Sequence, residues 1–431
     1  MLAQQVGLEK GVQSMPQVVE RCRVCGSPSL IPCASLGVQY LSSVFPSSLD
    51  YRAEVPQLPL DLVLCAKKED GSTCGLVQLA HKLDLRAMYN AYPYTSSTNS
   101  SMPAILQDVA ESGRTLGHLH PGDVILDIGC NDGTLLSYFQ RQGFALIGID
   151  PAKNIKPMLD SCDYTYIRDF FGASVYSSAT AKKARLIFSI AMFYHLVDPV
   201  NFSRDVSECL ADDGVWIIQM AYLPAMLRTN MYDNIVHEHC GYYATQHMKW
   251  IMKQVGLEIF DVRLNDVYGG SFRVFVKRKG CSRFPQTERY QAILREELEL
   301  GIFDPATYQA FMKRIQQTRT GLRALCGKIK EEGKTIWVYG ASTKGNTILQ
   351  YCSLGKSDIV AAADANPFKL GKYVVGADIP IMDEAAMRAA RPDYLLALPY
   401  SFLEGFMRRE AELVAKGTRF IVPLPVVRIV P

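Results

Sequence analysis

The sequence has no hydrophobic run long enough to cross a membrane and no excess of charge of either sign. Its longest apolar stretch, Leu186–Tyr194, is far shorter than the ~20 residues that a membrane-spanning helix needs. The 46 basic and 43 acidic residues leave a formal net charge of +3, which disfavours nucleic acid as a partner because phosphate-binding proteins carry a concentrated basic excess. The N-terminal sequence MLAQQVGLEKGVQSM has no continuous apolar segment, so we do not expect a signal peptide.

The composition is that of a folded protein with more than one domain. Hydrophobic residues make up 48% and charged residues 21% of the 431 residues, which excludes a disordered chain or a low-complexity fibre. This length predicts about two to three domains. We expect a soluble, cytoplasmic protein, in which twelve cysteines need an explanation because a reducing compartment disfavours disulfides.

Part of that explanation is a cysteine pattern in the first 75 residues. Cys22 and Cys25 form a C-x-x-C followed by glycine, a turn that directs two thiolates at one tetrahedral zinc ion. Cys65 and Cys74 are separated by the polar stretch AKKEDGST and can supply the second pair, since a longer loop between ligands costs little entropy. Cys33 is a spare or competing ligand. We predict a structural zinc; a redox or simply thiol-rich module is the alternative.

The middle of the chain predicts a nucleotide-binding α/β domain. From about residue 100 to 280, short apolar runs alternate with helical stretches, as in a doubly wound sheet. The dinucleotide pattern G-x-G-x-x-G is missing. Instead, the expected strand 123–127 ends at Asp127 and opens into Ile-Gly-Cys-Asn-Asp-Gly. An acid at this position repels a diphosphate and favours a cationic amino-acid ligand.

A second acid, Asp150, closes the next expected strand, where a carboxylate can accept both ribose hydroxyls. Together these features resemble the class I S-adenosylmethionine-dependent methyltransferases. The resemblance implies cofactor contacts from both strand ends and from the segment after the third strand: Asp127, Gly129, Asn131, Asp132, Gly133, Asp150 and Phe170. Asp150 would bind the ribose and Phe170 would lie near the adenine. A Rossmann-like fold that binds NAD, or no cofactor, is the alternative.

The motif His237-Glu238-His239 follows the fifth expected strand. It is not H-E-x-x-H, whose histidines lie one helical turn apart, so a catalytic zinc is not expected here. His237 and His239 cannot share a face, so we expect at most one to reach a substrate. Its position beyond the carboxyl ends of the strands favours function; the alternative is a cluster of satisfied polar residues.

Two further segments belong with this motif. His195 follows the fourth expected strand, again at the edge where α/β sheets bind ligands. The aromatic and hydroxyl-rich segment that contains Tyr92, Tyr94, Ser96 and Ser97 can cover a site with hydrogen-bond donors. A polar interdomain linker is the equally open alternative for that segment.

These motifs, taken in order, resemble the nucleotide-sugar C-methyltransferase family, which methylates a keto-deoxysugar at the carbon beside its ketone. The resemblance covers nearly the whole chain. After the cysteine module it includes Y-x-Y-x-S-S at 92–97, LDIGCNDG at 126–133, H-E-H at 237–239, GGSFR at 269–273, YGASTKGN at 339–346 and DANP at 364–367.

The resemblance implies methyl transfer through an enolate. His239 would remove the proton alpha to the ketone, and Glu238 would orient this base or polarise the sugar. Tyr92 or Tyr94, together with His195, would stabilise the developing oxyanion. The remaining substrate contacts are expected from His237, Ser96, Ser97, Arg273, Lys344 and Asn346.

The sequence departs from the family pattern at three places. Val236 stands where a tyrosine usually precedes H-E-H, and Tyr268 stands where a histidine is common. A short C-x-x-C usually replaces Cys65 and Cys74. The first two changes touch the substrate side, so a related branch with a different keto substrate explains them equally well.

Beyond a charged, turn-rich junction at 277–285, the sequence predicts a second βαβ unit with strands at 335–340 and 358–363. It also lacks G-x-G-x-x-G, so Lys344 and the helix N-terminus can instead hold the diphosphate of a nucleotide-sugar. A duplicated fold kept for packing is the alternative. We therefore predict a zinc-binding module at 1–85, a methyltransferase domain at 86–284 and a Rossmann-like substrate domain at 285–431.

Two other functions remain open at this point. The enzyme could keep the cofactor and methylate oxygen or nitrogen of another specialised metabolite. A non-catalytic zinc-platform protein with a decayed cofactor pocket is the other alternative.

Overall fold

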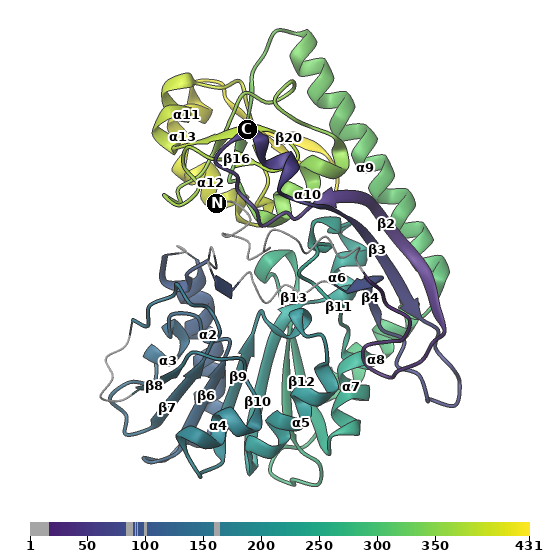
Figure 1. Cartoon of the computed structure of the whole chain (residues 1–431), viewed down its shortest axis with the longest axis vertical. Coiled ribbons are helices and arrows are strands. Elements are labelled where there is room, and N and C mark those ends of the chain that lie inside the picture. The colour runs from purple at the N-terminus through teal and green to yellow at the C-terminus, as the bar shows by residue number, and fades with distance from the viewer. Residues whose placement is uncertain (1–16, 83–88, 91, 93, 99–100, 159–163) are drawn as a thin grey trace.

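A computed structural model describes residues 17–82, 89–90, 92, 94–98, 101–158 and 164–431. Two mixed α/β units lie one above the other, and the long strands β2 and β3 run beside the helix α9 along one side of the molecule (Figure 1). The predicted fold class, a class I methyltransferase sheet with a second Rossmann-like unit and a small N-terminal module, is confirmed.

The first sheet has the strand order β12-β13-β10-β9-β6-β7-β8. Strand β13 is antiparallel to both of its neighbours, whereas the strands from β10 to β8 are parallel. Every residue of the central strand β6 is buried, which is why its sequence is almost continuously apolar. The strands are β6 (Val124–Ile128), β7 (Ala145–Ile149), β8 (Tyr164–Ile167), β9 (Ala184–Ile190), β10 (Leu210–Ala221), β12 (Leu257–Asn265) and β13 (Ser271–Arg278).

Seven helices of the described chain accompany this sheet. They are α2 (Met102–Gly117), α3 (Thr134–Ser137), α4 (Ala173–Ala179), α5 (Pro199–Cys209), α6 (Leu223–Arg228), α7 (Thr245–Gln254) and α8 (Glu288–Glu299). Helix α8 packs against β12, although the predicted boundary at 285 assigns it to the third unit. The domain boundaries therefore stay a prediction.

The second sheet has the order β16-β17-β15-β14-β18-β19-β20. Strand β14 lies between β15 and β18 and is parallel to both. The strands are β14 (Ile336–Tyr339), β15 (Ala362–Ala363), β16 (Tyr373–Val374), β17 (Ile379–Met382), β18 (Tyr394–Ala397), β19 (Arg419–Val422) and β20 (Arg428–Val430). The strand predicted from residue 358 is shorter than expected, because Asp358 closes a turn in which its carboxylate and backbone N–H both bond to Gly355.

The helices of this second unit are α9 (Pro305–Glu331), α10 (Thr343–Cys352), α11 (Glu384–Ala390), α12 (Leu403–Arg409) and α13 (Ala411–Ala415). Helix α10 follows β14 directly, as the predicted βαβ unit requires. Its N-cap Ser342 accepts a hydrogen bond from the backbone of Gly345, which is the usual device for starting a helix.

The N-terminal module contributes a four-stranded sheet with the order β11-β4-β3-β2. Strands β2 (Leu30–Tyr40), β3 (Gln57–Cys65) and β4 (Val77–Leu79) come from the module itself. The fourth strand, β11 (Gly241–Tyr242), comes from the middle of the chain. A separate short pair joins β1 (Gln17–Val18) to β5 (His81–Lys82).

The segment between β2 and β3 docks on the C-terminal unit. The amide N–H of Tyr40 donates to Gln350 at 2.8 Å, and the hydroxyl of Tyr51 donates to Asp378 at 2.8 Å. Arg52 forms an ion pair with the same Asp378 at 2.5 Å. The N-terminal module therefore contacts both α/β units and holds them in a fixed relation.

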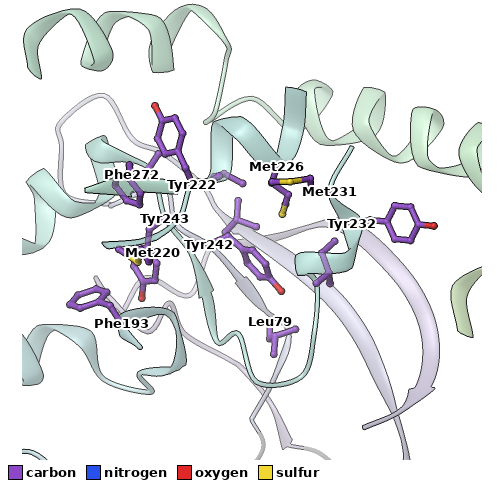
Figure 2. Close-up of a cluster of buried hydrophobic side chains, with 14 of the residues drawn as sticks. Leu79, Phe193, Met220, Tyr222, Met226, Met231, Tyr232, Tyr242, Tyr243 and Phe272 are labelled. Atoms are coloured by element: carbon purple, nitrogen blue, oxygen red, sulfur yellow. The ribbon is translucent and has the colours of Figure 1, made fainter. Parts of the chain in front are cut away.

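A buried hydrophobic cluster includes residues that precede and follow the H-E-H motif in the chain, such as Tyr232 and Tyr242 (Figure 2). Its side chains come from β4, β10, β11, β13, α6 and the segments beside them. The labelled residues are Leu79, Phe193, Met220, Tyr222, Met226, Met231, Tyr232, Tyr242, Tyr243 and Phe272. Since close-packed side chains leave little room for movement, this cluster fixes the backbone on both sides of the motif.

In the described ranges of the chain, no helix combines the length and the apolar character that crossing a membrane requires.

Candidate active site

The residues of the candidate site follow the carboxyl ends of parallel strands in both sheets. Tyr194 and His195 come after β9, and His239 comes after β10. In the other sheet, Lys344 comes after β14 and Tyr400 comes after β18. Because α/β sheets bind ligands outside these strand ends, both units direct their ligand-binding edges to the same region.

The loop after β6 has the backbone that close approach to a ligand requires. Gly129 has a φ of +75°, and a Cβ there would lie 3.2 Å from Met192, so a larger residue would be strained. The carboxylate of Asp150, at the end of β7, accepts hydrogen bonds from the backbone N–H groups of Asn131 and Ala152, both at 2.8 Å. These bonds hold the two predicted cofactor segments together, and the carboxylate retains capacity for ribose hydroxyls.

The same loop holds the tyrosine- and serine-containing connector. Asn131 accepts the N–H of Ser96 at 2.9 Å and donates its amide to the carbonyl of Tyr94 at 3.1 Å. Asp132 accepts the N–H of Ser97 at 2.9 Å. Both serines therefore bond to the cofactor loop through their backbone.

Carboxylates accumulate where the cofactor is expected. Burial raises the pKa of Asp127 to about 8, and the nearby charges of Asp150 and Asp132 add to this shift. Such a group loses its proton readily only when a cation arrives. The region therefore suits a ligand that carries a sulfonium and an ammonium group.

Aromatic side chains connect this region to the H-E-H motif. The ring of Tyr89 stacks on Tyr92 at 5.6 Å and meets Phe170 edge-on at 5.5 Å, both between centroids. The negative charges of Glu238 and Asp150 both act on Tyr92 and, with burial, raise its pKa well above the usual value. The structure thus brings Tyr92 between the predicted cofactor and catalytic residues as a neutral hydroxyl.

His239 has the geometry of a neutral base. Its Nδ1 lies 2.8 Å from the carbonyl oxygen of Asn234, and a carbonyl can only accept, so Nδ1 carries the proton and Nε2 holds the lone pair. Burial lowers the pKa of His239 well below 6.5, and the neighbouring side chains of His195 and Lys344 disfavour its protonation further. The imidazole is therefore unprotonated at neutral pH.

Three more groups surround this base. The rings of Tyr194 and His195 lie 4.2 Å and 5.4 Å from that of His239. Burial lowers the pKa of His195 to about 4, so it acts as a neutral ring. Glu238 accepts a hydrogen bond from the hydroxyl of Ser43, and burial raises its pKa. We call Tyr194, His195, Glu238 and His239 the base cluster.

The hydroxyl of Tyr94 is buried beside the side chains of Tyr268 and Ser96, and within the described chain it forms no hydrogen bond of good geometry. Native structures rarely leave such a group unsatisfied. This orphaned donor fits the predicted role of holding a substrate oxygen.

Three predicted substrate contacts are not brought into this cluster. The Nε2 of His237 donates to the carbonyl of Leu58 in β3 at 3.2 Å. Buried Arg273 bonds to Asp108, Ser112 and Gln219 and so ties β13 to α2. Asn346 donates to the carbonyl of Ser42 at 3.1 Å and joins the N-terminal module. The residues His237, Arg273 and Asn346 thus serve the fold in this structure.

The structure also adds residues that the sequence did not single out. The hydroxyl of Tyr400 donates to the buried carboxylate of Asp233 at 3.1 Å, which links the two α/β units. The Nζ of Lys344 lies 5.5 Å from the ring centroid of Tyr268. The position of Asp233 shortly before the H-E-H motif could have indicated its role from the sequence. Tyr400 and Ser43 belong to no motif, so nothing in the sequence indicated them.

The four predicted zinc ligands come together as expected. The sulfur atoms of Cys22, Cys25, Cys65 and Cys74 all lie within 4.8 Å of one another. The Cys22–Cys74 and Cys25–Cys65 sulfur distances are 3.4 Å and 3.5 Å, close to the roughly 3.8 Å that tetrahedral thiolates around zinc require. Cys33 lies outside this group. The donor set fits a closed structural zinc site.

This zinc site is coupled to the base cluster through the backbone. Cys74 lies just before β4, whose residues Val77 and Gln78 pair with Tyr242 and Gly241 of β11. Next to that pair, Leu79 donates its N–H to the carbonyl of Cys240 at 3.1 Å. The strand that follows His239 is therefore held by the zinc-binding module.

A second contact joins the zinc loop to helix α7. The Nδ1 of His247 accepts the N–H of Ala244, so Nε2 carries the proton and donates to the carbonyl of Gly75 at 3.0 Å. Trp250 donates to the carbonyl of Gly71 in the inserted loop at 3.2 Å. The long loop between Cys65 and Cys74 thus contributes to the interface with α7.

Three family models match the chain in sequence order. A zinc binding domain matches residues 22–89, a methyltransferase domain matches residues 102–262, and a C-methyltransferase C-terminal domain matches residues 266–425. The C-methyltransferase NovU of Streptomyces niveus is 29% identical over 97% of this chain and 99% of its own length.

Among solved structures, the plantazolicin methyltransferase BamL with SAH is 17% identical and covers 46% of this chain and 79% of its own, with a TM-score of 0.31. The magnesium protoporphyrin IX methyltransferase ChlM of Synechocystis PCC 6803 is 13% identical and covers 41% and 79%, with a TM-score of 0.32.

Removing zinc should disorder the strand after His239. Cys65→Ser should abolish stoichiometric zinc binding, because it removes one of the four thiolate ligands. Since about 10 kcal/mol or more of metal-binding free energy is coupled to folding in such modules, the loss of zinc should also loosen the module. Hydrogen exchange followed by mass spectrometry should then show faster exchange at 76–82 and 236–243 than in the zinc-loaded protein.

Cys33→Ser is the matched control, since Cys33 is a buried thiol outside the ligand group. It should keep one zinc per chain and normal exchange. Retention of zinc by Cys65→Ser, or loss in both variants, would contradict the ligand assignment.

Binding of S-adenosylmethionine should release a proton from Asp127. Its pKa of about 8 leaves it largely protonated at pH 7, and the cationic cofactor favours the ionised form. Below pH 8 the affinity should rise with pH by up to about tenfold per unit. Calorimetry in buffers of different ionisation enthalpy measures the proton release.

Asp127→Asn should lose this proton release, and the difference from the wild type separates Asp127 from the cofactor's own amino group. Asp123→Asn, at the other end of the same strand, should behave like the wild type. Equal proton release in all three proteins would show that Asp127 does not respond to the cofactor.

Proposed function

We propose that this chain, an S-adenosylmethionine-dependent C-methyltransferase with zinc-binding, methyltransferase and C-methyltransferase C-terminal domains, acts on a nucleotide-linked keto-deoxysugar. The methyl group goes to the carbon alpha to the ketone, through an enolate. Such a step belongs to the biosynthesis of a specialised metabolite or a surface glycan.

The observation that carries this proposal is the state of His239. A methyl transfer to carbon, unlike one to a hydroxyl or an amine, first needs a base that takes a proton from carbon. His239 is neutral, its Nδ1–H is held by Asn234, and its Nε2 keeps the lone pair. The Nε2 would take the alpha proton, and the electron pair of the broken C–H bond would become the enolate.

The proposed roles of the neighbours follow from their contacts. Glu238, held by Ser43, orients His239 or binds a sugar hydroxyl. His195 is neutral and, together with Tyr92 and the unpartnered hydroxyl of Tyr94, donates hydrogen bonds to the substrate. These donors stabilise negative charge best in a site that excludes water.

The methyl donor would be held by the predicted cofactor residues. When bound, S-adenosylmethionine would supply an electrophilic methyl group, with the sulfur as the leaving group; Asp127 and Asp132 would favour its positive charges, and Asp150 would bind its ribose. The C-terminal unit would hold the nucleotide part of the substrate at the carboxyl edge of its sheet.

Solvent exchange should reveal the enolate directly. Incubated in heavy water without a methyl donor, the wild type should introduce deuterium at the alpha carbon of keto-deoxysugars linked to thymidine, uridine or guanosine diphosphate, as followed by NMR. His239→Ala should abolish the exchange, by a factor of at least about 100 for a lost general base.

His237→Ala is the control, because that imidazole bonds to Leu58 outside the base cluster. It should retain exchange once its fold is verified by zinc content and cofactor binding. Methylation without any exchange in the wild type would refute the enolate route and favour methyl transfer to oxygen or nitrogen. Absence of cofactor binding would indicate a non-catalytic protein.

A further inference from the structure

Lys344 is a half-buried cation without a partner. It lies in the first turn of α10, directly after β14. Among the residues that the structure describes, none forms an ion pair or a hydrogen bond with its ammonium group, which lies 5.5 Å from the ring centroid of Tyr268. Leaving a lysine unpaired in a half-buried place costs stability, so an anion that binds here would recover that cost.

The acid beside Lys344 is already engaged elsewhere. Asp233 is 4% exposed and accepts the hydroxyl of Tyr400 at 3.1 Å. Its negative charge acts on Lys344 without forming a direct ion pair. Asp233 thus opposes the lowering of the Lys344 pKa by burial, and the N–H bonds of Lys344 are left for another ligand.

That ammonium lies on the reactive side of the site. Its positive charge acts on His239. The ring beneath it, Tyr268, lies beside Tyr94 and acts electrostatically on Tyr194 of the base cluster. Tyr268 adopts a left-handed backbone with a φ of +56°, which is unfavourable for a bulky residue. Strain of this kind concentrates at functional sites.

The chemistry requires a strong electrostatic partner at this place. A base with a lowered pKa is a weak base, so proton removal from carbon depends on stabilising the negative charge that moves to the ketone oxygen. The hydrogen-bond donors proposed above, His195, Tyr92 and Tyr94, are neutral. Of the described residues that act electrostatically on His239, Lys344 is the one with a lysine or arginine side chain.

We propose that Lys344 is a catalytic residue that binds the ketone oxygen and stabilises the enolate, and that Asp233 and Tyr400 are its positioning residues. The proposal rests on the function proposed above and moves Lys344 from the diphosphate to the reacting carbonyl. When His239 takes the alpha proton, the electron pair shifts toward the ketone oxygen, and the ammonium of Lys344 holds the resulting oxyanion until the carbon attacks.

Two measurements on Lys344→Met separate the carbonyl role from a diphosphate role. Deuterium exchange into the nucleotide-linked keto-deoxysugars should slow about 100-fold or more, as for the loss of an oxyanion donor. Calorimetric affinity for thymidine, uridine and guanosine diphosphates should stay within about twofold. Lys344→Arg, which keeps the charge, should restore exchange to within about tenfold of the wild type.

Lys328→Met, on the exposed face of α9, is the matched control and should leave both quantities unchanged. A fall of tenfold or more in nucleoside diphosphate affinity with normal exchange at saturating substrate would overturn the proposal in favour of a diphosphate role. Normal exchange and normal affinity would also overturn it. If the wild type exchanges none of these substrates, the proposed function fails rather than the role of Lys344.

The pH profile tests the positioning role of Asp233. Activity needs charged Lys344, so it falls as the pH rises through the pKa of that lysine, which burial lowers and Asp233 raises. Asp233→Asn keeps an acceptor for Tyr400 and removes the charge, so the basic limb of the exchange rate should move to lower pH. A lower rate with an unmoved basic limb would show that Asp233 is merely structural.

Discussion

The backbone pairing between β4 and β11 is the constraint on which the site depends. A two-residue strand has little stability of its own, since an isolated hairpin is marginal in water. Here Gly241 and Tyr242 complete the sheet of the zinc-binding module. The thiolate cluster sets the start of β4, β4 sets β11, and β11 fixes the chain just after His239. The metal site and the base are therefore parts of one mechanical unit.

The carboxyl edges of the two sheets, which face the same region, determine the electrostatics of the site. Each edge alone would be open to water. Together they bury the base cluster, and that burial lowers the pKa values of His195 and His239 and raises those of Tyr92 and Tyr194. The outcome is a set of neutral histidine and tyrosine side chains beside the carboxyl group of Glu238 and the amino group of Lys344, and each charge there has a strong effect because the local dielectric is low.

Much of this could be predicted from the sequence because it depends on local pattern. The strand expected at 123–127 is present as β6 at Val124–Ile128, and the four cysteine ligands form the predicted group. The pairing of β11, the hydroxyl of Ser43 at Glu238 and the contact of Tyr400 with Asp233 could not be predicted. They join segments that are far apart in the chain, and no local pattern encodes such contacts.

Sequence motifs also place residues near a site without saying where the side chains point. His237 and His239 belong to the same short motif, yet one bonds to β3 and the other to the segment before the motif. Arg273 belongs to a recognisable motif, and its guanidinium bonds to Gln219 of β10 and to Ser112 and Asp108 of α2. Proximity in sequence constrains the backbone, whereas side-chain direction is decided by the tertiary partners.

The two unusual residues on the substrate side illustrate the same distinction. Val236 is 2% exposed and belongs to the buried core beside the motif, so its side chain has no access to a ligand, whatever residue relatives carry there. Tyr268 lies beside Tyr94 and under the ammonium of Lys344. The two residues after it, Gly269 and Gly270, have no room for a side chain, because a Cβ would lie 2.5 Å from Met231 and Ala225, respectively. The departure at 236 is therefore a matter of packing, and the departure at 268 shapes the polar surroundings of the base.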